Sequence, residues 1–203
     1  MAAGLWAGGH LIARETVGAV QGNARLIGYA SVVLLLPLAA EVVTGVQLGL
    51  LAHALIGFLL IPPLVIKLGS VGYRFARYYA GDRHYRLAGP AEPVMRVLGA
   101  GLVLLTIVLF ASGIELWLFG YRFGQQWATW HKAAFVLWFL VVIVHVVAYV
   151  PRAADLTTAD WQSRLPGALS RQALVIVGLL LGAGLLLAML PFKSPFLPAL
   201  GGT

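Results

Sequence analysis

Residues 130–150 have the sequence WHKAAFVLWFLVVIVHVVAYV, and this stretch decides the class of fold. It is almost wholly apolar and long enough to cross about 30 Å of hydrocarbon as a single helix. His131 and His145 stand fourteen positions apart within it. Because fourteen residues make nearly four helical turns, the two imidazoles project from almost the same side, about 21 Å apart along the axis. Ionisable side chains are costly inside a bilayer and usually serve a function there, so the stretch predicts both a membrane span and a site.

The whole chain has the composition of an integral membrane protein. Of its 203 residues, 61% are hydrophobic and only 10% are charged, and the mean hydropathy is +0.91. These values lie far outside the range of soluble globular domains. The chain has no cysteine, which excludes disulfides, thiolate metal sites, iron–sulfur clusters and covalently attached c-type haem. The net charge of +7 is better explained by membrane topology than by nucleic acid, and no nucleic-acid partner is expected.

Five apolar segments predict an all-α fold, an integral membrane bundle of five transmembrane helices. The expected spans are 25–46, 48–73, 94–119, 130–150 and 172–191. We divide the chain into an N-terminal cytoplasmic segment (1–24), a four-helix transmembrane core (25–150), a cytoplasmic interfacial connector (151–171) and a last part with the fifth helix (172–203). A short helix is expected near residues 157–164. The proline-rich tail from Pro191 is expected to leave the membrane as an extended segment.

The distribution of basic residues predicts the orientation of the bundle. Of the 14 Lys and Arg residues, only Arg122, Lys132 and Lys193 fall on the side opposite the N-terminus. Basic residues are enriched in cytoplasmic loops, so we expect a cytoplasmic N-terminus and an outer C-terminus in a bacterial cell membrane. The largest basic group lies between the second and third spans, where it suits contact with anionic lipids or docking of a partner.

The fourteen-residue spacing recurs in the other three core spans. The second and fourth spans run in the same direction, and the first and third run opposite to them. Residues at equal depth therefore form two sets. The first level, nearer the outside, contains His53, His131, Gly45 and Gly113; the second level contains Lys67, His145, Ser31 and Gly99. Histidines on two co-directional helices can hold a flat macrocycle between them, and the small residues give it room.

This pattern resembles the transmembrane b-type cytochromes, and most closely the four-helix dihaem core of the cytochrome b subunits of respiratory complexes. The resemblance covers residues 28–150, and the fifth span has no counterpart in it. The segments IPPLVIKLGSVGYRFARYYAGDRHYRLAGP (61–90) and WHKAAFVLWFLVVIVHVV (130–147) are also similar to small actinobacterial-type multi-pass membrane proteins without an assigned role.

The resemblance to cytochrome b implies bis-axial haem b in residues 25–150 and electron transfer across the bilayer. It makes His53 and His131 the ligands of a haem at the first level, and His145 a ligand at the second. Lys67 departs from the family pattern, which has a fourth histidine. Its amine could ligate iron, its charge could pair with a haem propionate, or the second haem could be missing while Lys67 reaches the interface. One haem is expected and two are allowed.

The resemblance also implies partners for such a subunit. Electrons would pass between quinone, or a carrier on the cytoplasmic side, and an outer redox partner in a larger membrane complex. The chain would then be an electron-transfer subunit and not a complete enzyme. The rival class is a non-redox anchor, assembly or scaffold subunit, in which the histidines only bond to backbone carbonyls or water. A metal site without porphyrin is less favoured, because ligands about 21 Å apart cannot share one ion.

Glu41 and Glu115 lie near the outer ends of the first and third spans. A carboxylate at that depth could accept a proton during quinol oxidation. It could equally be a hydrated interfacial group that pairs with Arg122 or Lys132, which is the interpretation that we favour.

Overall fold

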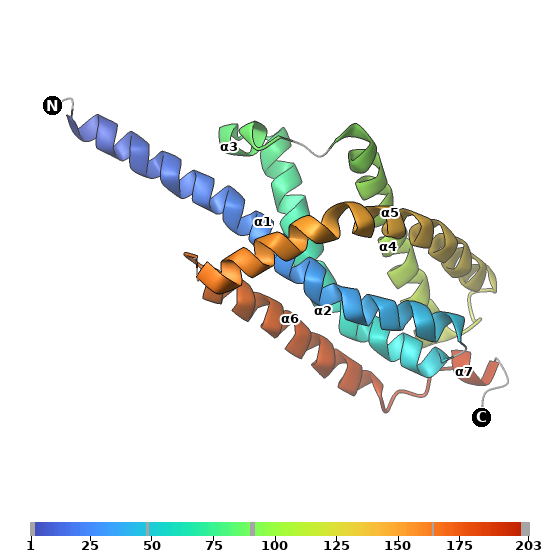
Figure 1. The fold of residues 1–203 in the computed structure, drawn as a ribbon. Helices are drawn as coiled ribbons and strands as arrows, with labels where there is room; N and C mark the ends of the chain where they lie inside the picture. Colours follow the sequence, from blue (N-terminus) through green and yellow to red (C-terminus); the bar gives the residue numbers. More distant parts are fainter. Residues whose placement is uncertain (1–2, 48, 90–91, 164, 200–203) are drawn as a thin grey trace.

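The computed structural model describes residues 3–47, 49–89, 92–163 and 165–199, with side-chain surroundings between residues 18 and 197. This part of the chain is all-helical (Figure 1), which confirms the predicted fold class. Five helices are long. They are α1 (Ala3–Val46), α2 (Leu50–Tyr79), α4 (Pro93–Phe119), α5 (Gln126–Ser163) and α6 (Ala168–Met189); α3 (Arg83–Leu87) and α7 (Phe196–Ala199) are short.

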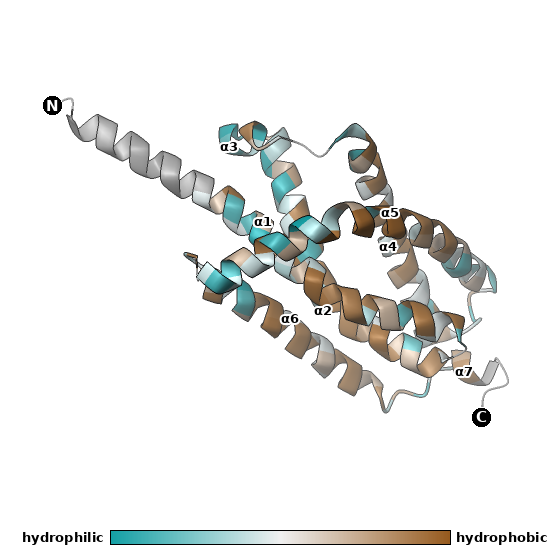
Figure 2. Cartoon of the chain, in the orientation of Figure 1, coloured by the Kyte–Doolittle hydropathy of each residue, from teal (hydrophilic) through white to brown (hydrophobic). Residues whose placement is uncertain are grey.

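Each long helix contains a segment long and apolar enough to cross a membrane. Figure 2 shows these segments as hydrophobic stretches of the ribbon. Many large apolar side chains on them face outward, such as Leu36 at 80% exposure and Val147 at 73%. Such surfaces are costly in water and fit contact with lipid, so the protein has the architecture of a multi-pass membrane protein.

The four core helices form a ring in which the two histidine-bearing helices are not neighbours. Helix α1 packs along α2 and crosses the C-terminal part of α5, and α4 packs along α5 (Figure 1). Helices α2 and α4 touch only briefly, and α2 and α5 make at most slight contact among the described residues. The ring therefore encloses a lumen with α2 and α5 on opposite sides.

Helix α6 packs on the outside of the ring against α2, next to the proline pair in α2. Pro63 has no N–H, so the carbonyl of Leu59 lacks its usual intrahelical donor. A Cβ built on Gly182 would collide with that carbonyl, and one on Gly178 would collide with Ile66. Small residues thus let the two helix backbones approach closely at the point where proline interrupts the backbone hydrogen bonds of α2.

Helix α5 continues through Pro151 to Ser163, where the sequence predicts a span that ends at residue 150 and a separate short helix. Tertiary contacts hold the extension against α1. A Cβ on Gly28 would lie 3.2 Å from the carbonyl oxygen of Ala153 and from the hydroxyl of Thr157. The carboxylate of Asp160 is fully buried and accepts hydrogen bonds from Arg171 at 2.9 and 2.6 Å. These contacts outweigh the tendency of proline to end a helix.

The tail after α6 also differs from the extended segment that the sequence predicts. The hydroxyl of Ser194 donates a hydrogen bond to the carbonyl of Trp117 at 2.7 Å. Phe196 packs against Tyr121 with ring centroids 5.5 Å apart. The tail thus folds back over the end of α4 and forms the short helix α7.

Candidate functional site

A cavity of about 1100 Å³ lies inside the ring of α1, α2, α4 and α5. Its size is at the upper end for small-molecule and cofactor sites. The residues predicted for the two levels all line this one cavity: His53, His131, Gly45, Gly113, Lys67, His145, Ser31 and Gly99. Helical spacing placed these residues on the lumen side of four different helices.

The first level brings two imidazoles together across the lumen in a T-shaped arrangement. The ring centroids of His53, on α2, and His131, on α5, are 6.0 Å apart, and the ring planes are at 88° to each other. Two imidazole nitrogens that share one metal ion at about 2 Å each would place their ring centroids roughly 6 Å apart. The separation therefore suits a single ion between the rings.

Helix α1 fixes the orientation of His53. The Nδ1–H of His53 donates a hydrogen bond to the backbone carbonyl of Glu41 at 3.0 Å, and the carboxylate oxygen Oε1 of Glu41 lies 3.3 Å from the same nitrogen. A histidine that donates from one ring nitrogen keeps a lone pair on the other. Nε2 of His53 has no hydrogen-bond partner among the described residues, so it is available for a ligand.

Helix α4 orients His131 in the same way. Nδ1 of His131 lies 2.9 Å from the hydroxyl of Ser112. That hydroxyl donates its only hydrogen to its own helix, where the carbonyl oxygens of Val108 and Leu109 lie 2.6 and 3.1 Å away. Because Ser112 has no second hydrogen, the bond requires Nδ1–H of His131 as the donor. Both first-level histidines thus adopt the tautomer with a free Nε2, which is the form that ligates metals.

The two first-level glycines make room for the histidine rings. A Cβ on Gly45 would lie 3.0 Å from the ring of His53, and a Cβ on Gly113 would lie 3.3 Å from Cε1 of His131. The prediction assigned these glycines to the edges of a porphyrin. In the structure their immediate neighbours are the imidazoles, because α1 and α4 approach the histidines closely from the side.

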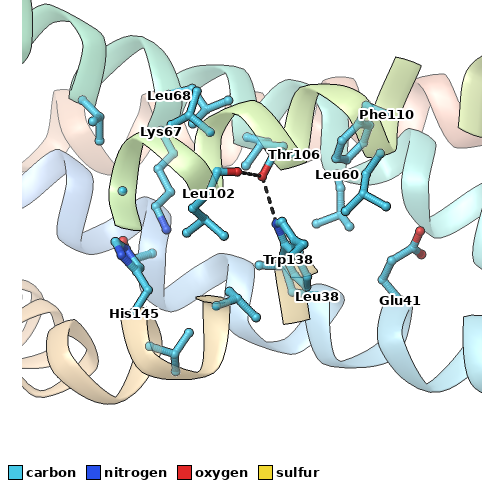
Figure 3. Close-up of a pocket in the computed structure, with 18 of the residues that line it drawn as sticks. Leu38, Glu41, Leu60, Lys67, Leu68, Leu102, Thr106, Phe110, Trp138 and His145 are labelled. Atoms are coloured by element: carbon cyan, nitrogen blue, oxygen red, sulfur yellow. Dashed lines mark hydrogen bonds between the residues drawn. The ribbon is translucent and has the colours of Figure 1, made fainter. Parts of the chain in front are cut away.

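The side chains of the second level are held by fewer contacts than those of the first level. Figure 3 shows the side chain of Lys67 extending from α2 across the lumen toward His145 on α5. Nδ1 of His145 is buried and has no hydrogen-bond partner, and its ring lies 4.8 Å from that of Tyr149. The hydroxyl of Ser31 bonds to Ile27 on its own helix, and a Cβ on Gly99 would meet nothing within 4 Å. The second level therefore lacks the close contacts from neighbouring helices that hold His53 and His131 at the first level.

An indole separates the two levels. Trp138 is only 8% exposed, and its Nε1 donates a hydrogen bond to Oγ1 of Thr106 at 2.9 Å. Figure 3 shows this pair between Glu41 at one end of the lumen and Lys67 and His145 at the other. The pair therefore marks the boundary between the two levels of this one cavity.

The two glutamates have different positions. Glu41 lines the cavity, and its Oε2 is buried without a hydrogen-bond partner. Both carboxyl oxygens of Glu115 are also buried without a partner, but Glu115 is not among the residues that line the cavity. Only Glu41 touches the candidate site.

Sequence reasoning missed three residues of this site, Ser112, Thr106 and Trp138. The spacing did contain a signal for two of them. Thr106 stands midway between Gly99 and Gly113, and Trp138 stands midway between His131 and His145. Seven residues are close to two turns, so both share the lumen-facing side of their helices. Ser112 carried no signal of this kind.

The donor set of the first level fits a porphyrin better than a bare ion. Among the described residues, no group of three or more His, Cys, Asp and Glu side chains could hold a metal ion alone. Two facing histidines leave an ion short of ligands, and a porphyrin supplies the remaining four nitrogens. The residues present therefore fit a haem at this level.

Searches of protein-family models, curated proteins and solved structures find no match for this chain.

Proposed function

We propose that the chain is a membrane b-type cytochrome subunit that holds one haem b between His53 and His131 and passes electrons across the bilayer. The observation that carries this proposal is the first-level pair. Two imidazoles from opposite helices stand 6.0 Å apart, and each is held through Nδ1 by a neighbouring helix. This arrangement leaves both Nε2 atoms free to act as axial ligands.

The surroundings of the pair support a buried redox group. Phe110, Leu109 and Trp138 line the lumen beside the histidines, and apolar walls keep water away and lower the local dielectric constant. The haem would supply one-electron chemistry, while the protein supplies ligands, orientation and electrostatics. Glu41 and Ser112 are then the groups that hold the ligands in one tautomer.

The proposed partners follow from the small size of the parts outside the membrane. The structure describes only short segments between the spans, so a catalytic domain of the complex would lie outside the described residues. Electrons would pass between quinone, or a carrier on the side of the basic segment that follows α2, and a redox partner on the opposite side. The membrane would be a bacterial cell membrane with the N-terminus in the cytoplasm.

The visible spectrum of the purified protein tests the proposal. A reduced-minus-oxidised spectrum should show the bands of bis-histidine haem b, and pigment extraction should give one haem per polypeptide. The substitution His131→Ala should remove this haem, whereas His145→Ala should leave it in place. A colourless protein, isolated intact after expression with sufficient haem, would contradict the proposal and favour the non-redox anchor or scaffold subunit.

A further inference from the structure

The second level of the cavity is rich in positive charge. Lys67 lines it from α2, and three arginines line the same end of the cavity, Arg74, Arg96 and Arg152. Among the acidic residues that line the cavity, Glu41 belongs to the first level, which leaves Glu92 at this end. Cations therefore outnumber acids here, and the excess favours an anionic ligand.

Lys67 has no protein counter-ion in the described residues. No ion pair or hydrogen bond joins its amine to another side chain in that part of the structure. The amine extends into the lumen toward His145 instead of outward to the lipid (Figure 3). A charged group inside a membrane protein normally pairs with an opposite charge, so an ammonium in this position calls for a ligand.

His145 supplies a second unused polar group at the same place. Its Nδ1 is shielded from solvent and lacks any hydrogen-bond partner. Buried polar atoms are nearly always paired, and an orphaned one requires an explanation. A ligand oxygen placed between Lys67 and His145 would satisfy both groups.

Between these charged groups and Trp138, the lining of the second level is mainly apolar. Leu64 and Leu68 line it from α2, and Val142 and Val146 line it from α5. These walls suit a hydrocarbon tail and not a hydrated ion. Because α2 and α4 touch only briefly, the wall between them is the weakest part of the ring and the natural route from the bilayer.

We propose that the second level binds the acidic headgroup of an amphiphile, a phosphate or a carboxylate, through Lys67 and His145. The apolar tail lies along the lumen on the side of Trp138 that faces Lys67 and His145. This site is independent of the first-level haem, and it replaces the second haem that the cytochrome b pattern would place here.

The test uses the full-length protein in lipid nanodiscs, with thermal unfolding and native mass spectrometry as readouts. Phosphatidylglycerol in a phosphatidylcholine disc should raise the Tm by about 5 °C, the shift expected for a ligand well above its Kd. A phosphatidylglycerol adduct should survive release from the disc. A separate arm adds oleate to the phosphatidylcholine disc, and a third adds inorganic phosphate. A response to phosphatidylglycerol assigns a phosphate headgroup, and a response to oleate assigns a carboxylate.

Two lysines give a matched pair of variants, since Lys67 and Lys132 line opposite ends of the same cavity. Lys67→Met should abolish the Tm shift and the adduct, and Lys132→Met should keep both. Lys67→Arg retains the charge and should keep at least part of the Tm shift. This variant distinguishes an effect of the lost charge from an effect on folding. Circular dichroism checks that each variant is folded.

Three results would overturn the inference. They are an equal response in wild type and Lys67→Met, a response to inorganic phosphate alone, and two haems per polypeptide of which one is lost in the Lys67 and His145 variants. The absence of any haem would contradict the proposed function and leave this measurement unaffected.

Discussion

Trp138 donates a hydrogen bond to Thr106 at 2.9 Å midway between the two levels of the cavity. The hydroxyl of Thr106 in turn donates to the carbonyl of Leu102 at 2.7 Å, so the indole is fixed to the backbone of α4. Both side chains are 8% exposed. The pair thus links α5 to α4 at the boundary between two levels of different chemistry.

Loss of this link between α5 and α4 should lower stability without removing the first-level ligands. Trp138→Phe loses one buried hydrogen bond, which should cost about 1 kcal/mol. Trp138→Ala also leaves a cavity and should cost about 3–5 kcal/mol. Thermal unfolding in detergent measures both effects, and Trp161→Phe is the control because Trp161 is 65% exposed. Equal stability of Trp138→Ala and wild type would show that the buried indole does not stabilise the contact between α4 and α5.

Ser112 should control the affinity of the first level through His131. In Ser112→Ala the Nδ1–H of His131 loses its acceptor. Loss of a group that holds a ligating histidine typically lowers the affinity for the bound metal group by about 10- to 100-fold. Haem titration followed by absorbance measures the change. Ser70→Ala is a matched control, because the hydroxyl of Ser70 bonds only to Ile66 on its own helix. Equal affinity of the two variants would contradict the assigned role of Ser112.

The glycines should differ in their tolerance of a methyl group. A Cβ on Gly45 would press on the ring of His53 at 3.0 Å, which is closer than carbon atoms normally approach. Gly45→Ala should therefore displace His53 and weaken haem binding, and Gly113→Ala should do so less, because its contact distance is 3.3 Å. Gly99→Ala should bind haem like the wild type, since a Cβ there meets nothing within 4 Å. Spectral titration of the three variants tests this order, and weaker binding in Gly99→Ala than in Gly45→Ala would reverse it.

The sequence was most informative where one helical period determined the result. A spacing of fourteen residues fixes both the depth and the side of a helix, so it predicted that His53, His131 and Lys67 would line a common lumen. The same reasoning could not predict that the carbonyl of Glu41 and the hydroxyl of Ser112 hold the imidazoles, because those contacts depend on how neighbouring helices rotate against each other. Continuation of α5 through Pro151 was likewise beyond a local signal. It depends on Gly28 and on Asp160, which contact distant parts of the chain.

Asp82 should make the segment after α2 sensitive to acid. Its carboxylate accepts hydrogen bonds from the backbone amides of His84 and Tyr85 at 2.9 and 3.2 Å and pairs with Arg77. Burial raises the pKa of Asp82, but the two amides and Arg77 outweigh it and hold the pKa below its ordinary value. The stabilisation is therefore fully present above the unfolded-state pKa of about 3.9 and is lost as pH falls through the lower folded-state value.

The pH dependence can be measured as the difference in Tm between wild type and Asp82→Asn. We expect a constant difference at neutral pH that shrinks below about pH 4. Asp155 is exposed and its side chain has no hydrogen bond or ion pair among the described residues, so Asp155→Asn serves as the control at each pH. A difference that grows on acidification would have the wrong sign for this assignment.

Asp160 should be the most sensitive charged residue outside the cavity. Its side chain is completely buried, and it joins three helices by accepting two hydrogen bonds from Arg171 of α6 and lying 3.8 Å from Arg25 of α1. Removal of one partner leaves a buried charge without compensation, so Asp160→Asn should lower the free energy of unfolding by about 3 kcal/mol or more. Arg171→Gln should have a similar effect, and the double variant should cost less than the sum of the two, because neither charge is then left alone. Denaturation of the four proteins completes this cycle, and strictly additive losses would show that the pair is not coupled. Since the extension of α5 beyond Pro151 is held to α1 and α6 through this carboxylate, the single variants should also become sensitive to proteolysis between residues 151 and 163, while the first-level haem spectrum should remain unchanged.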